Sequence, residues 1–186
     1  MISIVIPTLN EEKNIEKTLY KIEKVSKKFT LDVIIVDDNS KDNTIKIVEQ
    51  FFSKLNIKII RNRKKLGLGY ALNLGYKSSY YSFVMFLDAD LSVSENDITK
   101  LFHAREKNGI VIGSRYIKGS KIIGADKKKV LASYLLNLLI SKIFRLKIID
   151  ISHSFRIISK KVGLITKNFT HPGFFGKQQF AQYGFV

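Results

Sequence analysis

The chain alternates between short apolar runs and longer stretches with helical spacing. Apolar runs occur at residues 2–6, 32–36, 57–60, 83–87 and 110–113. The segments 13–27, 44–54, 70–78 and 95–107 lie between them and predict helices, because apolar side chains recur there at helical spacing. Apolar runs rich in Val, Ile and Phe are typical of strands buried on both faces of a parallel sheet. This order predicts an α/β fold with one mostly parallel sheet, right-handed crossovers and helices on both faces.

The first strand is expected to turn at residues 7–10, with Asn10 as the N-cap of the next helix. Glu11 and Glu12 would then favour the positive end of that helix. No basic region precedes the first apolar run, so we interpret it as a strand and not as a signal peptide.

Residues 130–149 contain the strongest candidate for membrane contact. The run from Val130 to Ile140 is largely apolar, but Lys142, Arg145 and Lys147 follow it closely. A spanning helix needs about 20 apolar residues, so this segment does not span a bilayer. It is either a core helix or an interfacial helix with a basic flank. With no repeats and no low-complexity linker, residues 1–186 are expected to form a single domain.

The chain is strongly basic, with 32 Lys and Arg against 16 acids and a formal net charge of +16. Such a balance predicts attraction to an anionic partner, although a Lys-rich surface without such a function would give the same excess. No zinc-finger spacing and no aromatic RNA-binding strand is present, so we expect no nucleic-acid partner. The absence of Cys excludes disulfides and thiolate chemistry, and is compatible with a reducing compartment.

Two of the predicted strands end in paired acids, Asp37-Asp38 and Asp88-Ala89-Asp90. Ligands of open α/β sheets collect at the carboxyl ends of the strands. Asp88 and Asp90 could hold Mg²⁺ or Mn²⁺ together with phosphate oxygens, or could be solvated turn residues or caps of helix 95–107. A carboxylate of the first pair could accept hydrogen bonds from a ribose or a base, or could cap helix 44–54. Gly67 and Gly69 precede the next helix and would allow backbone N–H groups to approach a phosphate, although a tight turn needs glycines equally.

Five motifs occur in order with suitable gaps: Pro7-Thr8-Leu9-Asn10-Glu11, Val36-Asp37-Asp38-Asn39-Ser40, Lys65-Leu66-Gly67-Leu68-Gly69, Asp88-Ala89-Asp90-Leu91-Ser92 and Gly113-Ser114-Arg115-Tyr116. With them the chain resembles the family 2 inverting glycosyltransferases, which have the A-type nucleotide-diphosphosugar transferase fold. It is most similar to the dolichol- and polyprenyl-phosphate mannosyltransferases, through Gly113–Gly119, through Lys129, Ser133 and Asn137, and through Ser154-Phe155-Arg156. The resemblance covers about residues 2 to 165.

The resemblance implies a role for each matching position. Nucleotide-sugar binding is implied for Pro7, Leu9, Glu11, Val36, Asp38, Asp88, Ala89 and Asp90. A Mg²⁺ or Mn²⁺ ion would be bound by Asp88, Asp90 and Ser92. Arg115 would neutralise phosphate charge as a catalytic residue with Asp88 and Asp90, and would bind the acceptor phosphate with Lys129 and Ser133.

Several positions depart from the family's pattern. Leu9 replaces the usual Tyr, which weakens stacking on a base, and Ser92 replaces a longer residue beside the metal. Lys129 in place of Arg loses the bidentate fork but keeps the charge. Residues 171–179 match poorly the segment that leads to the family's basic closing loop, so we expect that loop to be absent or truncated.

The implied function is transfer of a sugar to a polyprenyl or dolichyl phosphate with inversion, with mannose from GDP-mannose as the first choice. The protein would act in protein glycosylation, as a cytoplasmic protein peripheral on the cytoplasmic face of a membrane, and could have a membrane-anchoring subunit. One alternative is another donor, UDP-glucose or UDP-GlcNAc, or a glycan hydroxyl acceptor, which would need a general base such as Asp126 or Asp150. Another is an inactive, truncated nucleotide-sugar-binding protein. A processive polysaccharide synthase is not expected, because the chain has no Trp.

Overall fold

The computed structural model describes residues 1–90, 93–105, 109–117, 120, 126–145, 148–150, 153–163 and 180–184. Within these residues seven strands form one sheet: β1 (Ile2–Thr8), β2 (Leu31–Asp37), β3 (Ile57–Arg61), β4 (Phe83–Phe86), β5 (Ile110–Ser114), β6 (Arg156–Ser159) and β7 (Phe180–Gly184). They are accompanied by the helices α1 (Ile15–Ser26), α2 (Thr44–Glu49), α3 (Leu68–Ser78), α4 (Glu95–Ala104), α5 (Lys127–Ile143) and α6 (Lys160–Gly163). The five strands and five helices predicted from the hydrophobic pattern are all present, with shifted ends.

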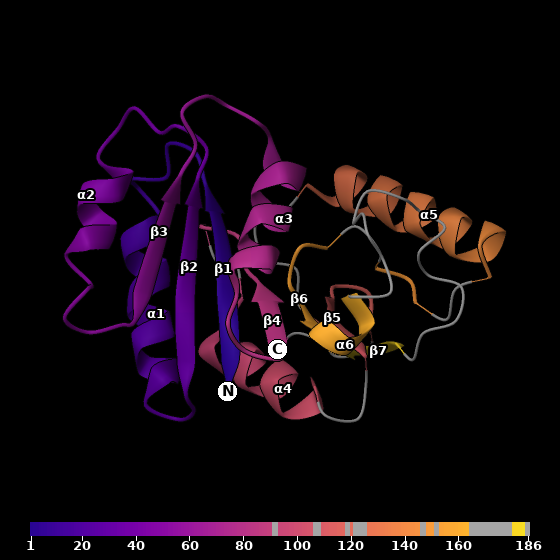
Figure 1. Ribbon diagram of the computed structural model, residues 1–186. Helices are drawn as coiled ribbons and strands as arrows, with labels where there is room; N and C mark the ends of the chain where they lie inside the picture. Colours follow the sequence, from indigo (N-terminus) through magenta and orange to yellow (C-terminus); the bar gives the residue numbers. More distant parts are fainter. Residues whose placement is uncertain are drawn as a thin grey trace.

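The sheet has the strand order β3-β2-β1-β4-β6-β5-β7 (Figure 1). Neighbouring strands run parallel, except that β6 is antiparallel to both β4 and β5. The prediction of a mostly parallel sheet is therefore confirmed. The sequence did not predict β6 or β7, because a four- or five-residue run with few apolar positions is too short to assign by periodicity.

Side chains of β1 alternate between two apolar cores, as the pleat of a strand requires. Ile4 and Ile6 pack with α1, α2 and α4 on one face of the sheet. Val5 packs with Ala71 and Tyr76 of α3 on the other face. Helices thus cover both faces, as predicted, while α5 projects from the β5 side (Figure 1) and adds no described side chain to either core.

Gly75 of α3 is required by the close approach of this helix to the sheet. A Cβ built at Gly75 would lie 2.3 Å from Val5 Cγ1 and 3.2 Å from Val36 Cγ2. Both valines are fully buried, so neither can move aside into solvent. The missing side chain therefore lets α3 lie directly on β1 and β2.

The strand order reverses between β1 and β4, since β2 and β3 extend the sheet on one side of β1 and β4 follows on the other. Such a topological switch point leaves a crevice at the carboxyl ends of the two strands, where open α/β sheets bind their ligands. Both acidic pairs lie at this edge, since Asp37 ends β2 and Asp38 follows it, and Asp88 and Asp90 follow β4. The fold thus makes this edge of the sheet the expected place for a ligand site.

Candidate active site

A cavity of about 410 Å³ lies at the carboxyl ends of β1, β2 and β4. This volume lies within the range of small-molecule sites. Seven of the predicted nucleotide-sugar positions line it: Pro7, Leu9, Glu11, Asp38, Asp88, Ala89 and Asp90. The eighth, Val36, is fully buried in the core beneath, on the α3 side. The structure thus gathers residues that are up to 83 positions apart in the sequence, from Pro7 to Asp90.

Asp38 holds the loop between β3 and α3. Its Oδ1 accepts hydrogen bonds from Leu66 N at 2.8 Å and from Asn62 Nδ2 at 2.9 Å, and its Oδ2 accepts one from Gly67 N at 2.8 Å. Burial acts to raise the pKa of this carboxyl, but the hydrogen bonds from Leu66, Asn62 and Gly67 hold the pKa below its usual value. The first task of Asp38 is therefore to place the loop that carries Lys65 and Gly67 over the cavity.

Asp37 is fully buried and is used within the fold. It accepts hydrogen bonds from the Thr8 hydroxyl and from both the backbone N–H and the hydroxyl of Ser40, and Arg61 Nε lies 3.6 Å away. Neither acid of this pair caps α2, whose N-cap is Asn43. The capping alternative for Asp37 and Asp38 is therefore wrong.

The segment after β1 is tied to the segment after β2. Asn10, with a positive φ of 57°, donates its N–H to the Ser40 hydroxyl and accepts from Lys41 N. Glu11 N donates to Thr44 Oγ1 at 2.8 Å. The prediction of Asn10 as an N-cap is wrong: α1 begins at Ile15, because residues 10–12 bind the loop before α2 and do not start a helix.

Asp88 and Asp90 are both exposed at the end of β4, and Ala89 between them is buried. The Thr18 hydroxyl donates to Ala89 O at 2.5 Å and fixes the backbone between the two acids. Asp88 accepts a hydrogen bond from the Ser154 hydroxyl. Asp90 has no hydrogen bond or ion pair with any residue that the structure describes. Its carboxylate is thus left for a ligand.

The capping alternative for these acids is also wrong. α4 is capped by Ser94, whose side chain accepts from Asp97 N at 3.2 Å while Asp97 Oδ2 accepts from Ser94 N. This reciprocal pair is a capping box. Asp88 and Asp90 therefore have no role at that helix end.

The donor set at β4 fits a hard divalent cation. Mg²⁺ is usually held by one or two carboxylates together with substrate phosphates, and Asp88 and Asp90 supply two carboxylates at the rim of the cavity. No cluster of three or more acidic or His ligands occurs among the described residues, so an ion there would need oxygen atoms from the substrate or water. Ser92, the third predicted metal residue, lies outside the described residues.

Arg115 follows β5 and is engaged by a buried acid. Its Nε and a terminal nitrogen donate to the two oxygens of Asp150 at 3.0 and 2.8 Å, and its backbone N–H donates to the same carboxylate at 2.8 Å. The hydrogen bond to Asp150 raises the pKa of Arg115 above its usual value. Since Asp150 is fully buried, this bidentate pair fixes the guanidinium and compensates much of its charge.

The predicted acceptor-phosphate residues Lys129 and Ser133 lie one turn apart on α5. Lys129 is exposed and has no ion pair among the described residues. The Tyr116 hydroxyl donates to Ser133 Oγ at 2.8 Å and connects α5 to the end of β5. Arg115, Lys129 and Ser133 therefore belong to one neighbourhood beside the β5 end of the sheet.

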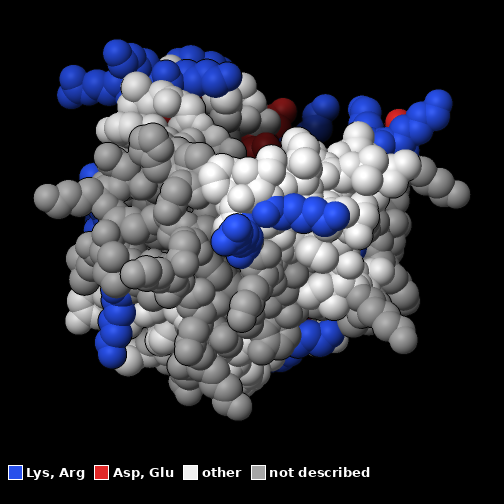
Figure 2. Space-filling view, turned by 90° about the vertical axis from the view of Figure 1, so that its right-hand side faces the viewer, with Lys and Arg blue, Asp and Glu red and all other residues white. Residues whose placement is uncertain are grey.

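The outer face of α5 is apolar and exposed. More than half of the surface of four leucines is accessible: Leu131, Leu135, Leu136 and Leu139. Its buried residues are instead polar, namely Asn137 and Ser141. The core-helix alternative for this segment is therefore wrong, because none of the described apolar side chains of α5 is buried. Figure 2 shows this pale surface with Lys and Arg side chains around it.

Gly67, predicted to lie near a phosphate, is part of the cavity wall. Other residues of this region were not assigned a role from the sequence. Thr8, Lys65, Leu68 and Ala71 complete the wall. Ser154 reaches Asp88 because the antiparallel register pairs Phe86 with Arg156, which brings the residues two positions beyond each into contact. Only the direction of β6, which the sequence pattern does not give, could have indicated this contact.

Comparison with known proteins decides the family. The model of "Glycosyl transferase family 2" matches residues 3–163. The chain belongs to glycosyl transferase family 2. A dolichol-phosphate mannosyltransferase from Pyrococcus furiosus is 37% identical over 123 residues, which is 65% of this chain and 35% of that protein. This family 2 chain therefore spans about a third of the length of that relative.

Solved structures show the same fold. The chain matches S. aureus TarS in complex with UDP-GlcNAc with a TM-score of 0.70 and 19% identity, covering 98% of this chain and 56% of that one. It matches glucosyl-3-phosphoglycerate synthase from Mycobacterium tuberculosis, in complex with Mn²⁺, UDP-glucose and phosphoglyceric acid, with a TM-score of 0.68 and 18% identity, covering 98% and 68%. The predicted A-type glycosyltransferase fold is thus confirmed.

No helix in the described part of this family 2 chain has the length and apolarity needed to cross a membrane. Residues 171–179, compared above with the family's closing segment, lie outside the described residues.

Proposed function

We propose that this family 2 protein transfers a sugar from a nucleotide diphosphate sugar to a polyprenyl phosphate, with inversion at the anomeric carbon. The observation that carries the proposal is the position of α5, whose N-terminal half holds Lys129 and Ser133 and whose outer face is exposed leucine. A polyprenyl phosphate has the matching chemistry, an anionic head on an apolar tail. The name of the Pyrococcus relative supports this acceptor and favours mannose as the sugar.

A phosphate acceptor needs no general base, because it is already an anion near neutral pH. One acceptor oxygen attacks the anomeric carbon, a new C–O bond forms on one face, and the bond to the diphosphate breaks on the other. The protein's task is to bring two anions together and to stabilise the departing diphosphate. A divalent cation on Asp88 and Asp90 would supply charge stabilisation for that leaving group when bound.

The residues divide this task between two groups. Leu9, Glu11 and the loop held by Asp38 would enclose the nucleoside in the cavity. Lys129 would supply positive charge to the acceptor, because Arg115 already shares its charge with Asp150. Arg115 would then act as a fixed, oriented donor rather than as a free charge.

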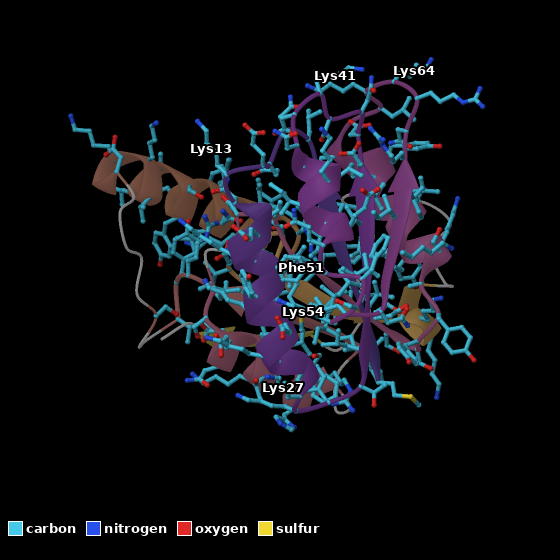
Figure 3. The ribbon with its side chains drawn as sticks, turned by 90° about the vertical axis from the view of Figure 1, so that its left-hand side faces the viewer. Lys13, Lys27, Lys41, Phe51, Lys54 and Lys64 are labelled. Atoms are coloured by element: carbon cyan, nitrogen blue, oxygen red, sulfur yellow. The ribbon has the colours of Figure 1, made fainter. Side chains whose placement is uncertain are left out.

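A membrane surface would deliver the acceptor. Four leucines more than half exposed form an apolar patch on the order of a few hundred Å², which is typical of an interaction surface. Lys128 and Lys129 at one end of α5, and Lys142 and Arg145 at the other, would attract anionic lipids. Figure 3 shows two further lysines, Lys41 and Lys64, at the same carboxyl-end edge of the sheet as the cavity, whereas Lys27 lies at the opposite end.

The proposal also includes the identity of the nucleotide-sugar donor. GDP-mannose is the first candidate from the relative's name, and UDP-glucose and UDP-GlcNAc are the alternatives because the two solved structures hold UDP-sugars. A panel of the three donors with Mg²⁺ or Mn²⁺ should show transfer to undecaprenyl phosphate and none to undecaprenol. The anomeric configuration of the product, measured by NMR, should be inverted.

Asp90→Asn should abolish transfer, whereas Glu49→Gln, an exposed acid-to-amide change on α2, should retain it. Transfer to the alcohol but not the phosphate would refute the proposed acceptor, and binding of a donor without any transfer would favour an inactive nucleotide-sugar-binding protein. Full activity of Asp90→Asn would refute the metal assignment alone.

Membrane contact needs a separate experiment. The protein should sediment with phosphatidylcholine vesicles that contain phosphatidylserine, and less with phosphatidylcholine alone. The double variant Leu135→Glu, Leu139→Glu should lose this binding. Tyr80→Glu is the control, because Tyr80 is 85% exposed and precedes β4, at the opposite end of the sheet from the cavity. Equal binding by wild type and the double variant would refute contact through α5.

A further inference from the structure

The most buried described side chains of α5 are polar, which is the reverse of an ordinary surface helix. Ser133, Asn137 and Ser141 recur every fourth residue on one face, and Asn137 and Ser141 are buried. A buried polar stripe is costly unless its groups are hydrogen-bonded, so these contacts define what the stripe does.

Ser133 is held by two donors. The Tyr116 hydroxyl donates to Ser133 Oγ at 2.8 Å, and Asn137 Nδ2 donates to Ser133 O at 2.8 Å and approaches Ser133 Oγ at 3.4 Å. Tyr116 is itself fixed, because its ring meets the ring of Tyr134 edge-on at 5.2 Å and the Arg115 guanidinium lies 5.2 Å from the ring centre.

This arrangement determines how the Ser133 hydroxyl can be used. A serine hydroxyl has one proton to donate and two lone pairs that accept. Tyr116 and Asn137 occupy the accepting side, and no residue in the described part of the chain accepts the proton of Ser133. That proton therefore remains for a ligand, and a ligand that only accepts hydrogen bonds is favoured. A chain of donors also strengthens the last donor in it.

We infer that Tyr116 is a positioning residue for the acceptor phosphate. It fixes the Ser133 hydroxyl as a donor towards a phosphate monoester, beside Lys129 one helical turn away, and so selects an anion over an alcohol. The inference rests on the proposed function, because it concerns the acceptor of that reaction. It gives a role to the Tyr of the Gly-Ser-Arg-Tyr segment, whose motif alone implies none for this residue.

Calorimetric binding of farnesyl phosphate and of farnesol in detergent tests this inference without turnover. Tyr116→Phe keeps the ring and removes only the hydroxyl. It should weaken the binding of farnesyl phosphate roughly fivefold to tenfold, the effect of one hydrogen bond, and leave farnesol binding unchanged. Tyr134→Phe is the matched control, since it removes a hydroxyl from the same ring pair and should change neither. In the transfer assay Tyr116→Phe should raise the KM for the lipid phosphate and leave kcat and the KM for the donor near the wild-type values.

A double-mutant cycle with Ser133→Ala shows whether Tyr116 acts through Ser133. Tyr116→Phe should have no further effect once Ser133 is Ala. Wild-type affinity of Tyr116→Phe, an equal loss of farnesol binding, or additive losses in the cycle would each overturn the inference. So would a wild-type protein that binds the phosphate no better than the alcohol. If the phosphate is discriminated as expected but no sugar is transferred, the proposed function fails and the inference stands.

Discussion

Two acids of the β2 region should respond in opposite ways to loss of their charge. Asp38, just beyond the carboxyl end of β2, accepts three hydrogen bonds from residues 62–67. Asp32, near the amino end of the same strand, has a buried Oδ1 that accepts no hydrogen bond. Burial raises the pKa of Asp32, whereas the hydrogen bonds from the 62–67 loop, acting against burial, lower the pKa of Asp38. The substitutions Asp38→Asn and Asp32→Asn therefore form a matched pair.

The cost of Asp38→Asn follows from its geometry. The new amide can still accept from Leu66 and Asn62 through its oxygen, but its NH₂ group would face the N–H of Gly67, donor against donor. A hydrogen bond to a charged group contributes about 1.5–3 kcal/mol, and the two remaining bonds become neutral and weaker. We expect a loss of about 2–4 kcal/mol in the free energy of unfolding at neutral pH. Asp32→Asn should be neutral or stabilising by up to about 1 kcal/mol, because it removes a poorly solvated charge.

The pH dependence has a fixed sign for each acid. The lowered pKa of Asp38 stabilises the fold above the unfolded pKa of about 3.9, and this stabilisation disappears as the pH falls through the folded pKa. The difference between wild type and Asp38→Asn should therefore shrink in acid. The raised pKa of Asp32 penalises the charged form, so any gain from Asp32→Asn should be present at neutral pH and absent below the unfolded pKa.

Urea unfolding followed by circular dichroism at neutral and acid pH measures both variants. With a slope of about 2 kcal/mol/M, a loss of about 2–4 kcal/mol moves the midpoint by roughly 1–2 M. Asp38→Asn should also raise the KM for the nucleotide sugar, since the loop that it holds carries Lys65 and Gly67 into the cavity wall. If Asp38→Asn cost less than about 0.5 kcal/mol, or if Asp32→Asn cost as much as Asp38→Asn, the reasoning from hydrogen-bond satisfaction would be refuted.

Two further substitutions test the packing and the buried ion pair. Gly75→Ala should destabilise the protein by about 1–2 kcal/mol in urea unfolding, because the overlap with Val5 outweighs the gain in helix propensity. Gly69→Ala in the same helix, where a Cβ meets nothing within 4 Å, should be neutral or stabilising, and an equal loss in both variants would contradict the overlap. Arg115→Lys should cost about 1–3 kcal/mol in the same measurement, because one ammonium cannot reproduce the bidentate bond to Asp150. Unchanged stability of Arg115→Lys would show that this pair is not needed for folding.

The sequence predicted the part of the site that depends on strand ends. Apolar runs located β1, β2 and β4, and parallel strands bring their carboxyl ends to one edge, so the meeting of Leu9, Asp38 and Asp90 could be anticipated. The hydrophobic pattern could not locate Ser154, because its contact with Asp88 depends on an antiparallel strand of four residues. The pattern also could not orient α5. An apolar helix has the same composition whether its leucines face a core or face outward, and only the packing of Asn137 inward distinguishes the two.

The four acids at the carboxyl ends of β2 and β4 differ in how far the fold already uses their carboxylate oxygens as hydrogen-bond acceptors. Asp37 is fully buried and its carboxylate is taken by Thr8 and Ser40, and Asp38 is taken by the 62–67 loop. Asp88 has one hydrogen bond, from Ser154, and Asp90 has none with the residues that the structure describes. A carboxylate binds a cation with oxygens that do not already accept hydrogen bonds from the protein. The ability to bind a metal ion should therefore increase from Asp37 and Asp38 to Asp88, and from Asp88 to Asp90. Substitution by Asn should therefore reduce stability most at Asp37 and Asp38 and metal-dependent transfer most at Asp90. A reversal of these two effects would mean that hydrogen-bond saturation does not decide which acids bind the ligand.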